Sequence, residues 1–446
     1  MNVDVKIRYV SFDGASVVVS IDEKIMKNGE IASFVLKMTG IGDDIISAVD
    51  FESLEFCDNV GAIPVCFEDI SRPPRVIRKI RANRDTDGRI SIRYICKFKP
   101  ARRNPILDMG IERNGTMGAG ENFLPSFNRE KINLNIGFDI SDLPENCSYV
   151  WTYGGSGSFE VKGDVLSSSY FCVGKINRCE KGNFGFYWLD DTVDLSETAA
   201  VAEKIFSDFS DFFGDTDEPY RILARCRETS VCGGTAADRS YAYIYAPKMH
   251  PSKEDLKLLF AHEIVHNWTT MSDIPYGICT WYQEGIADLY STLLLYRNGM
   301  LTRDELIFDL NSKSRQYYEN PCISLPNDQL GKLLFKDLEA TTVPYGRGFF
   351  YLLSVDYDIR MATDGKKTLD DIVKKLLSIN KPDNEAWLSE LEKIGLADAR
   401  AKFDRMCSGE IISPVLSCFD GADIEITQTH SVRRRTGEEC TVWEFK

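Results

Sequence analysis

The sequence is poor in histidine and has no long apolar run. Only 4 of its 446 residues are histidine, and its formal net charge is −15. No window approaches the roughly 18 consecutive apolar residues of a membrane-spanning helix. The acidic balance argues against nucleic acid or an anionic membrane as the main partner. The first residues, MNVDVKIRYVSFDG, lack the apolar stretch of a signal peptide, so a cytoplasmic location is expected.

The cysteines lack the spacing of a metal or redox motif. Thirteen of them are scattered from Cys57 to Cys440 without a CxxC pair. In a long chain this spread indicates reduced, mostly buried thiols rather than a disulfide framework. A chain of 446 residues also exceeds the usual size of one compact core, so two or three domains are expected.

The first part of the chain, residues 1–188, is expected to form an all-β, sandwich-like domain. Alternating or β-branched runs are separated by clusters of Gly, Pro, Asn and Asp, the pattern of strands and turns. These runs are ASVVVSID (15–22), RISIRYICKF (89–98) and KINLNIGFDI (131–140).

The pattern changes near residue 190. Residues 194–215 have the spacing of an amphipathic helix, and strand-like runs follow at 220–226 and 240–247. The chain then reads as mainly helical from Ser252 to about Arg400. The tail, 411–446, returns to short strand-like pieces, and its basic run VRRRTG is expected to be a solvated surface strand or turn.

Two of the four histidines lie four positions apart in the helical run LKLLFAHEIVHNW. At 3.6 residues per turn, His262 and His266 project from one face of a helix, one above the other. This spacing allows two imidazoles to bind one tetrahedral metal, with Glu263 beside the open coordination position, where it can move a proton. The alternative is an amphipathic helix that merely tolerates two histidines.

The next helical run, TWYQEGIADLYSTLLLYRNG (280–299), supplies a candidate third ligand in Glu284. Asp288 lies four residues later on the same helix face. It is placed to accept the free N–H of a metal-bound histidine, which fixes the ring orientation. The sequence therefore predicts one Zn²⁺ per chain, held by His262, His266 and Glu284.

At this point the sequence resembles a known group of enzymes. His-Glu-x-x-His followed by Glu-x-x-x-Asp is the pattern of the gluzincins, the thermolysin-like metallopeptidases. The phrases HNW (266–268) and TWYQEGIADLY (280–290) are similar to segments of the aminopeptidase N and glycyl aminopeptidase families. DIRMATDGKKTLDDIVKKL (358–376) is similar to a helix of the glycyl aminopeptidase group.

A further segment, VPYGRGFFYLL (343–353), resembles the "VPYEKG" segment of aminopeptidase N relatives. In that family the tyrosine of this segment hydrogen-bonds the oxyanion of the tetrahedral intermediate. The resemblance implies this role for Tyr345. The alternative for a single tyrosine is a packed aromatic side chain.

One departure from the family pattern concerns the substrate. In these aminopeptidases an edge strand before the metal helix carries a glutamate that binds the free amine of the substrate. Gly233 and Gly234 match that strand, which leaves room for substrate backbone, but Ala236 stands at the position of the glutamate. Glu121, in GAGEN (118–122), and Asp238 are the candidate replacements, although GAGEN is more simply read as a Gly-rich turn of the β domain.

The sequence thus predicts a multidomain α+β protein, with an N-terminal all-β sandwich-like domain followed by a thermolysin-like catalytic domain. The expected bounds are 1–188 for the β domain, 189–380 for the zinc peptidase domain and 381–446 for a C-terminal extension. The predicted function is zinc-dependent hydrolysis of peptide bonds, as an aminopeptidase acting on peptides. The alternatives are an endopeptidase, a non-catalytic binding module and a zinc hydrolase of non-peptide substrates.

Overall fold

The structure, a computed structural model, describes residues 1–38, 45–72, 74–100, 107–227, 233–246, 253–272, 277–334, 336–419 and 421–446. Its contacts divide the chain into two compact units. Unit 1 is Met1–Glu203 with Asp217–Pro251, and unit 2 is Lys204–Thr216 with Ser252–Lys446. The expected domain ends at residues 188 and 380 do not coincide with these divisions. Strands beyond residue 217 pair with strands before 188, and the last 60 or so residues pack with the helices.

Unit 1 is built almost entirely of strands, together with two short 3-10 helices, η1 (Phe51–Ser53) and η2 (Gly120–Asn122). Its described strands are β1 (Asn2–Ser11), β2 (Gly14–Asp22), β3 (Glu30–Met38), β4 (Ile45–Ile46), β5 (Glu55–Asp58), β6 (Gly61–Ala62), β7 (Val65–Arg72), β8 (Arg75–Ala82), β9 (Ile90–Lys97), β10 (Lys99–Pro100), β11 (Gly110–Glu112), β12 (Gly115–Ala119), β13 (Ile132–Asp139), β14 (Ser148–Trp151), β15 (Gly157–Val161), β16 (Tyr170–Gly174), β17 (Asn177–Lys181), β18 (Phe184–Trp188), β19 (Tyr220–Cys226), β20 (Gly233–Ala237) and β21 (Ser240–Tyr245).

The strands predicted at 15–22, 89–98 and 131–140 form as β2, β9 and β13. They belong to a seven-stranded sheet with the order β15-β13-β1-β2-β9-β5-β6, in which β1 pairs parallel with β13 and antiparallel with β2. Alternate residues along β1 are buried, because successive side chains of a strand point to opposite faces.

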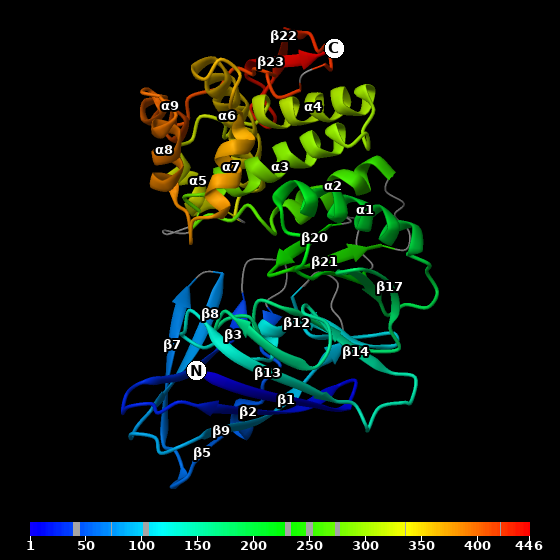
Figure 1. Cartoon of the computed structure of the whole chain (residues 1–446), viewed down its shortest axis with the longest axis vertical. Helices are drawn as coiled ribbons and strands as arrows, with labels where there is room; N and C mark the ends of the chain where they lie inside the picture. The colour runs from blue at the N-terminus through cyan, green and yellow to red at the C-terminus, as the bar shows by residue number, and fades with distance from the viewer. Residues whose placement is uncertain are drawn as a thin grey trace. The chain divides into compact units, whose positions relative to one another are not determined.

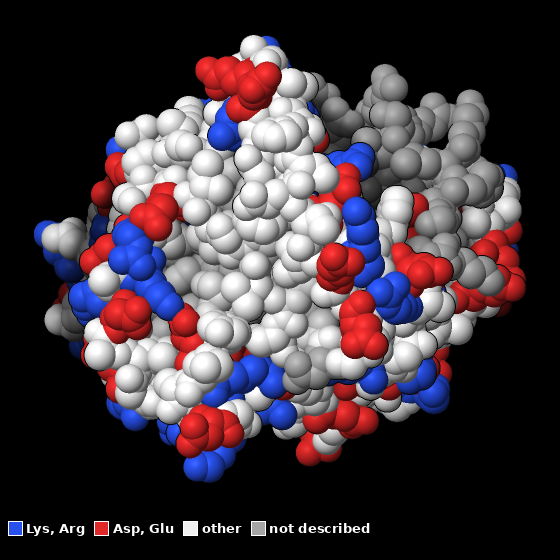
Figure 2. Space-filling view, turned by 90° about the horizontal axis from the view of Figure 1, so that it is seen from above, with Lys and Arg blue, Asp and Glu red and all other residues white. Residues whose placement is uncertain are grey.

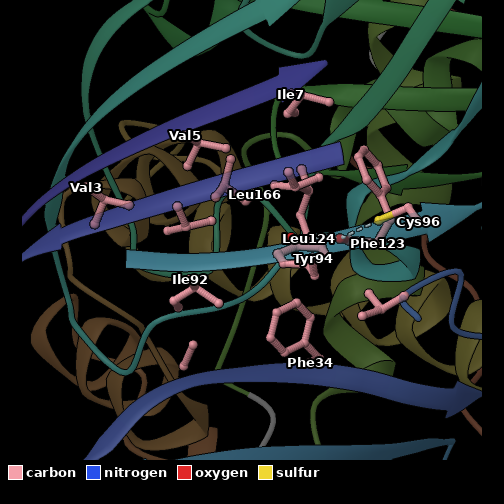
Figure 3. Close-up of a cluster of buried hydrophobic side chains, with 14 of the residues drawn as sticks. Val3, Val5, Ile7, Phe34, Ile92, Tyr94, Cys96, Phe123, Leu124 and Leu166 are labelled. Atoms are coloured by element: carbon pink, nitrogen blue, oxygen red, sulfur yellow. Dashed lines mark hydrogen bonds between the residues drawn. The ribbon is translucent and has the colours of Figure 1, made fainter. Parts of the chain in front are cut away.

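The core of unit 1 receives side chains from three sheets rather than from the two of a simple sandwich. Val5 and Ile92 come from the seven-stranded sheet and Phe34 from the four-stranded sheet β4-β3-β8-β7 (Figure 3). A third sheet, β10-β11-β12-β16-β14, contributes Phe171. Within this core the buried Tyr94 hydroxyl donates to the Phe123 carbonyl at 3.0 Å.

The fourth sheet of unit 1 has the order β17-β18-β19-β21-β20. Strands β18, β19 and β21 run parallel, and β20 pairs antiparallel with β21 at the edge. The edge strand β20 is the segment that carries Gly233, Gly234 and Ala236. Gly234 has a packing role, since a Cβ there would lie 2.1 Å from the Ala242 carbonyl oxygen, whereas a Cβ at Gly233 would lie within 4 Å of none of the described atoms beyond its chain neighbours.

Unit 2 is mainly helical, as predicted for the chain beyond residue 252, and ends in a β-hairpin (Figure 1). The described elements that follow unit 1 are α2 (Lys253–Val265), α3 (Thr280–Arg297), α4 (Arg303–Tyr318), α5 (Asn327–Leu333), α6 (Leu338–Ala362), α7 (Leu369–Leu377), α8 (Asn384–Lys393), α9 (Ala399–Cys407), β22 (Ile426–Val432) and β23 (Glu439–Phe445). The earlier helix α1 (Ser196–Phe213) contains the division between the units. The Ser252 cap and the SDIPYG turn expected from the sequence lie largely outside the described residues.

Helices α3 and α6 approach each other closely at two glycines. A Cβ on Gly348 would lie 1.8 Å from the Trp281 carbonyl oxygen and 2.8 Å from the Cα of Gly285. Neither helix can carry a side chain here without moving away from the other. Gly285 directly follows Glu284 and Gly348 lies one turn beyond Tyr345, so this crossing brings the predicted third ligand close to the predicted catalytic tyrosine.

The basic run at the tip of the C-terminal hairpin forms a turn between β22 and β23. Its side chains are not simply solvated. Arg433 donates to the carbonyls of Tyr318 and Asn320 at 3.2 Å, where α4 ends. Arg434 pairs with Glu339 at 2.9 Å, in the first turn of α6. The hairpin thereby joins the end of α4 to the start of the helix that carries Tyr345.

On the face shown in Figure 2, charged side chains of both signs lie near one another around a central area of uncharged residues. Among the described residues, no helix is both long enough and apolar enough to span a membrane.

Candidate metal centre and catalytic residues

The two histidines of the motif face each other at the end of α2. His262 lies in the last turn of the helix, and His266 lies in the turn directly after Val265, one residue beyond the helix end. Their Nε2 atoms are 3.2 Å apart, and the two rings stand at 86°. Two ring nitrogens therefore point at one common position.

Glu284, in the second turn of α3, completes a triangle of ligand atoms. Its Oε2 lies 3.3 Å from the Nε2 of His262 and 3.6 Å from the Nε2 of His266. Among the residues that the structure describes, this buried oxygen has no hydrogen-bond partner. Neighbouring ligands of a tetrahedral zinc, each about 2.05 Å from the metal, are about 3.4 Å apart. The donor set and all three separations therefore fit zinc.

Asp288 orients the first of these ligands. One turn after Glu284 on α3, its Oδ1 lies 2.9 Å from the Nδ1 of His262. A carboxylate at this place accepts the Nδ1–H and leaves Nε2 free to bind a metal. Burial opposes protonation of His262, but hydrogen bonds and charges from Asp288 and Glu284 outweigh it and raise the pKa of this ring to about 10.

Tyr345 and Glu263 stand beside the same position. The ring of Tyr345 on α6 stacks on His262 with centroids 5.8 Å apart and planes at 12°. Burial raises the pKa of Tyr345, and the nearby carboxylates of Glu284, Asp288 and Glu263 raise it further, so its hydroxyl remains a hydrogen-bond donor. Glu263 follows His262 on α2 and is half-buried. Unit 2 thus brings the predicted ligands and both predicted catalytic residues together.

The four residues suggested for substrate binding all belong to unit 1. Gly233 and Gly234 lie on the edge strand β20. The carboxylate of Asp238 accepts a hydrogen bond of 2.7 Å from the hydroxyl of Tyr153, and Lys162 lies 3.8 Å from its other oxygen.

Glu121, the fourth of these residues, lies in the 3-10 helix η2 and is nearly buried. Its carboxylate pairs with the guanidinium of Arg75, whose Nε is 2.7 Å from Oε2 and whose Nη2 is 3.5 Å from Oε1. Both candidate carboxylates for an amine thus already have basic partners, which the sequence did not suggest. The pair Arg75–Glu121 joins residues 46 positions apart, so no local pattern reveals it.

Two polar residues behind the metal position were also missed. Lys313 and Asp309 on α4 form a buried ion pair of 2.7 Å, four residues apart. In a sequence, such a pair has the spacing of an ordinary surface salt bridge on a helix. Nothing in the local pattern separates the buried pair from an exposed one.

The fold is that of the gluzincin zinc metallopeptidases of the aminopeptidase N, or M1, type. An aminopeptidase N family protein from Idiomarina loihiensis superimposes with a TM-score of 0.68 at 14% identity, over 96% of this chain and 79% of that one. An M1 zinc metallopeptidase mutant from Deinococcus radiodurans, bound to a Tyr-Ser-Ala substrate, gives 0.54 at 15% identity, over 93% and 95%. Leukotriene A4 hydrolase from Saccharomyces cerevisiae gives 0.55 at 13% identity, over 91% and 66%.

These likenesses concern the fold, since the sequence identities are low. A scan of the sequence against family models finds no match, and a search of curated protein sequences finds none either. The function is therefore argued from the side chains of this chain.

Proposed function

We propose that this protein is a zinc-dependent peptidase that binds one Zn²⁺ and removes residues from the N-terminus of peptides. The observation that supports it most directly is the ligand triangle of His262, His266 and Glu284, with edges of 3.2, 3.3 and 3.6 Å. Asp288 behind it and Tyr345 beside it add the groups that metal-assisted hydrolysis requires. The aminopeptidase part of the proposal draws on the M1-type structural neighbours.

Bound at this triangle, zinc would supply Lewis acidity, which polarises a scissile carbonyl and makes a water more acidic. The half-buried carboxylate of Glu263 takes a proton from the attacking water and returns it to the leaving amine. The neutral hydroxyl of Tyr345 donates a hydrogen bond to the oxyanion that develops on the carbonyl. Asp288 keeps the His262 ring in the tautomer that binds metal through Nε2.

A mixed peptide library incubated with the zinc-loaded protein tests this proposal, with the cleavage sites read by mass spectrometry. We expect loss of single residues from the N-terminus and no cleavage after chelation of the metal. Cleavage at internal bonds would indicate an endopeptidase. No cleavage of any peptide, despite a full zinc complement, would favour a binding module or a hydrolase of non-peptide substrates.

The variant Tyr345→Phe is expected to lower kcat by about 100-fold through the loss of one oxyanion donor. The phenyl ring can keep the stacking on His262, so the melting temperature should change little. Steady-state kinetics and thermal unfolding of the same preparation check both statements. A large loss of stability with a modest loss of rate would instead identify Tyr345 as a packed aromatic residue.

N-terminal acetylation of a good peptide substrate is expected to reduce kcat/KM by at least about 30-fold. An ammonium in a partly dry site needs a carboxylate partner, and losing such a charged contact costs several kcal/mol. Glu121 and Asp238 are the proposed partners. A carboxylate accepts several hydrogen bonds, so either one can hold an ammonium beside its present donor.

Two single variants locate the amine-binding group. Glu121→Gln or Asp238→Asn should reduce cleavage of free peptides to the level of acetylated ones, and only the variant of the true partner should do so. Equal cleavage of free and acetylated peptides by the wild-type protein would exclude recognition of the N-terminus. That result would favour an endopeptidase that cleaves internal bonds, with the same zinc-dependent chemistry.

A further inference from the structure

A column of polar side chains leads from the metal position along α3 to α4. Glu284, Asp288 and Thr292 recur every four residues and so share one face of α3. The Thr292 hydroxyl donates to the Oδ2 of Asp309 on α4 at 2.6 Å. Thr292 and Asp309 are both buried. The column therefore brings a third carboxylate into the same buried region as Glu284 and Asp288.

Lys313 brings a positive charge to this column. Its Nζ is 2.7 Å from the Oδ1 of Asp309, and the two side chains are only 11% and 7% exposed. The same ammonium lies 5.9 Å from the ring centre of Phe349 on α6. Burial lowers the pKa of Lys313, but the charges of Asp309 and Asp288 raise it by more. The ammonium is therefore charged at neutral pH.

The cluster is rich in carboxylates, because Glu284, Asp288 and Asp309 supply three of them. Within the described parts of the chain, their ion pairs shorter than 4.0 Å are with the two motif histidines and Lys313. The Thr292 hydroxyl, which contacts Asp309, also lies 3.0 Å from the backbone carbonyl oxygen of Asp288. Hydrogen bonds thus connect the Lys313–Asp309 pair to the residue that contacts His262.

We propose that Lys313 is an internal counter-cation of the metal site, which stabilises the buried carboxylates when no metal is bound and lowers the affinity for zinc. This inference rests on the zinc site of the proposed function. The ammonium of Lys313 and a bound divalent cation neutralise the same group of carboxylates and repel each other. The charge of Lys313 therefore opposes zinc binding, and removal of that charge should strengthen zinc binding. Lys313 acts through Asp309 and Asp288, as a positioning residue rather than a catalytic one.

The variants Lys313→Met and Lys313→Arg test the proposal through zinc affinity, measured by competition with a chelator of known affinity. Lys313→Met removes the charge and keeps the stem, so we expect zinc to bind at least about fivefold more tightly. The metal-free protein should lose more stability than the zinc-loaded one, which enlarges the rise in melting temperature on zinc addition. Lys313→Arg should behave as the wild type.

Asp309→Asn gives a result of opposite sign, because it removes a negative charge from the cluster. Zinc should bind at least about fivefold more weakly in this variant. The double variant Lys313→Met, Asp309→Asn restores the charge balance and avoids a buried unpaired ion. Its zinc affinity should return close to that of the wild type, and this measurement remains decisive where Lys313→Met alone fails to fold.

A matched control is the ion pair of the half-buried Arg360 and the buried Asp356, which is 2.6 Å long and also spans four residues. It lies about 22 Å along α6 from Tyr345. Arg360→Met should lower the melting temperature equally with and without zinc and leave zinc affinity unchanged. The inference would be overturned if Lys313→Met bound zinc as the wild type does or more weakly. It would also be overturned if the zinc affinity of the double variant departed widely from that of the wild type. A wild-type chain that binds no zinc would contradict the proposed function itself.

Discussion

Replacing Glu263 with glutamine is expected to lower kcat by at least about 100-fold while the protein keeps its fold and its zinc. Glutamine has the size of glutamate and can occupy the same half-buried position on α2. The proposed metal ligands are His262, His266 and Glu284, so this variant leaves the proposed ligand set unchanged. An amide cannot take up and return a proton at neutral pH, so the transfer from water to the leaving amine loses its carrier.

Steady-state kinetics, zinc content by elemental analysis and thermal unfolding of the Glu263→Gln variant check this expectation together. Glu392→Gln is a suitable control, because this glutamate is exposed on α8 and the change removes the same charge. The control should retain full activity. Wild-type turnover by Glu263→Gln would mean that the general base is another residue, and loss of zinc would mean that the variant disturbs the metal site.

Much of the local structure could be predicted because it follows from periodicity. The alternation of apolar residues around Val17, Ile92 and Leu134 predicts strands, and these strands form with alternate residues buried. The helical part beyond residue 252 was predictable for the same reason. The division into units was not, since it depends on which distant strands pair. The sheet order joins Phe186 to Ile222 in parallel, across more than 30 residues of chain.

The candidate site was predictable where one helix brings residues together by its own geometry. Helical spacing alone relates His262 to His266 and Glu284 to Asp288. The end of the helix was harder to predict. Helix α2 ends at Val265, and His266 lies in the following turn with its ring still facing His262. The sequence pattern could not tell whether His266 lies inside the helix or in the turn after it.

The residues that escaped prediction act through partners from distant parts of the chain. Lys313 reaches the metal region because α4 packs beside α3, and Arg75 neutralises Glu121 across 46 positions. Local patterns describe a residue's own element and do not reveal which element packs against it. For Glu121 this matters to function, since its ion pair bears directly on whether it can bind the amine of a substrate.

The variant Glu284→Gln is expected to weaken zinc binding by at least about 100-fold and with it to abolish turnover. The carboxylate is one of the three proposed protein ligands and the only one of them that would bring a negative charge to the metal. A neutral amide oxygen is a weaker donor for Zn²⁺, and the charge of the ion is then no longer offset at the ligand triangle. Chelator competition measures the affinity, and elemental analysis after dialysis measures the zinc that remains.

Asp288→Asn provides the graded comparison that makes this prediction specific. The side chain of Asp288 contacts His262 at Nδ1 and not the metal position, so its change should weaken zinc about 10- to 100-fold, less than the loss of a direct ligand. The expected order of zinc affinity is wild type, then Asp288→Asn, then Glu284→Gln. The reverse order for the two variants would assign the metal to Asp288 instead. Equal affinity in all three proteins would place the metal away from α3, and the triangle would then be only a cluster of two histidines and an acid.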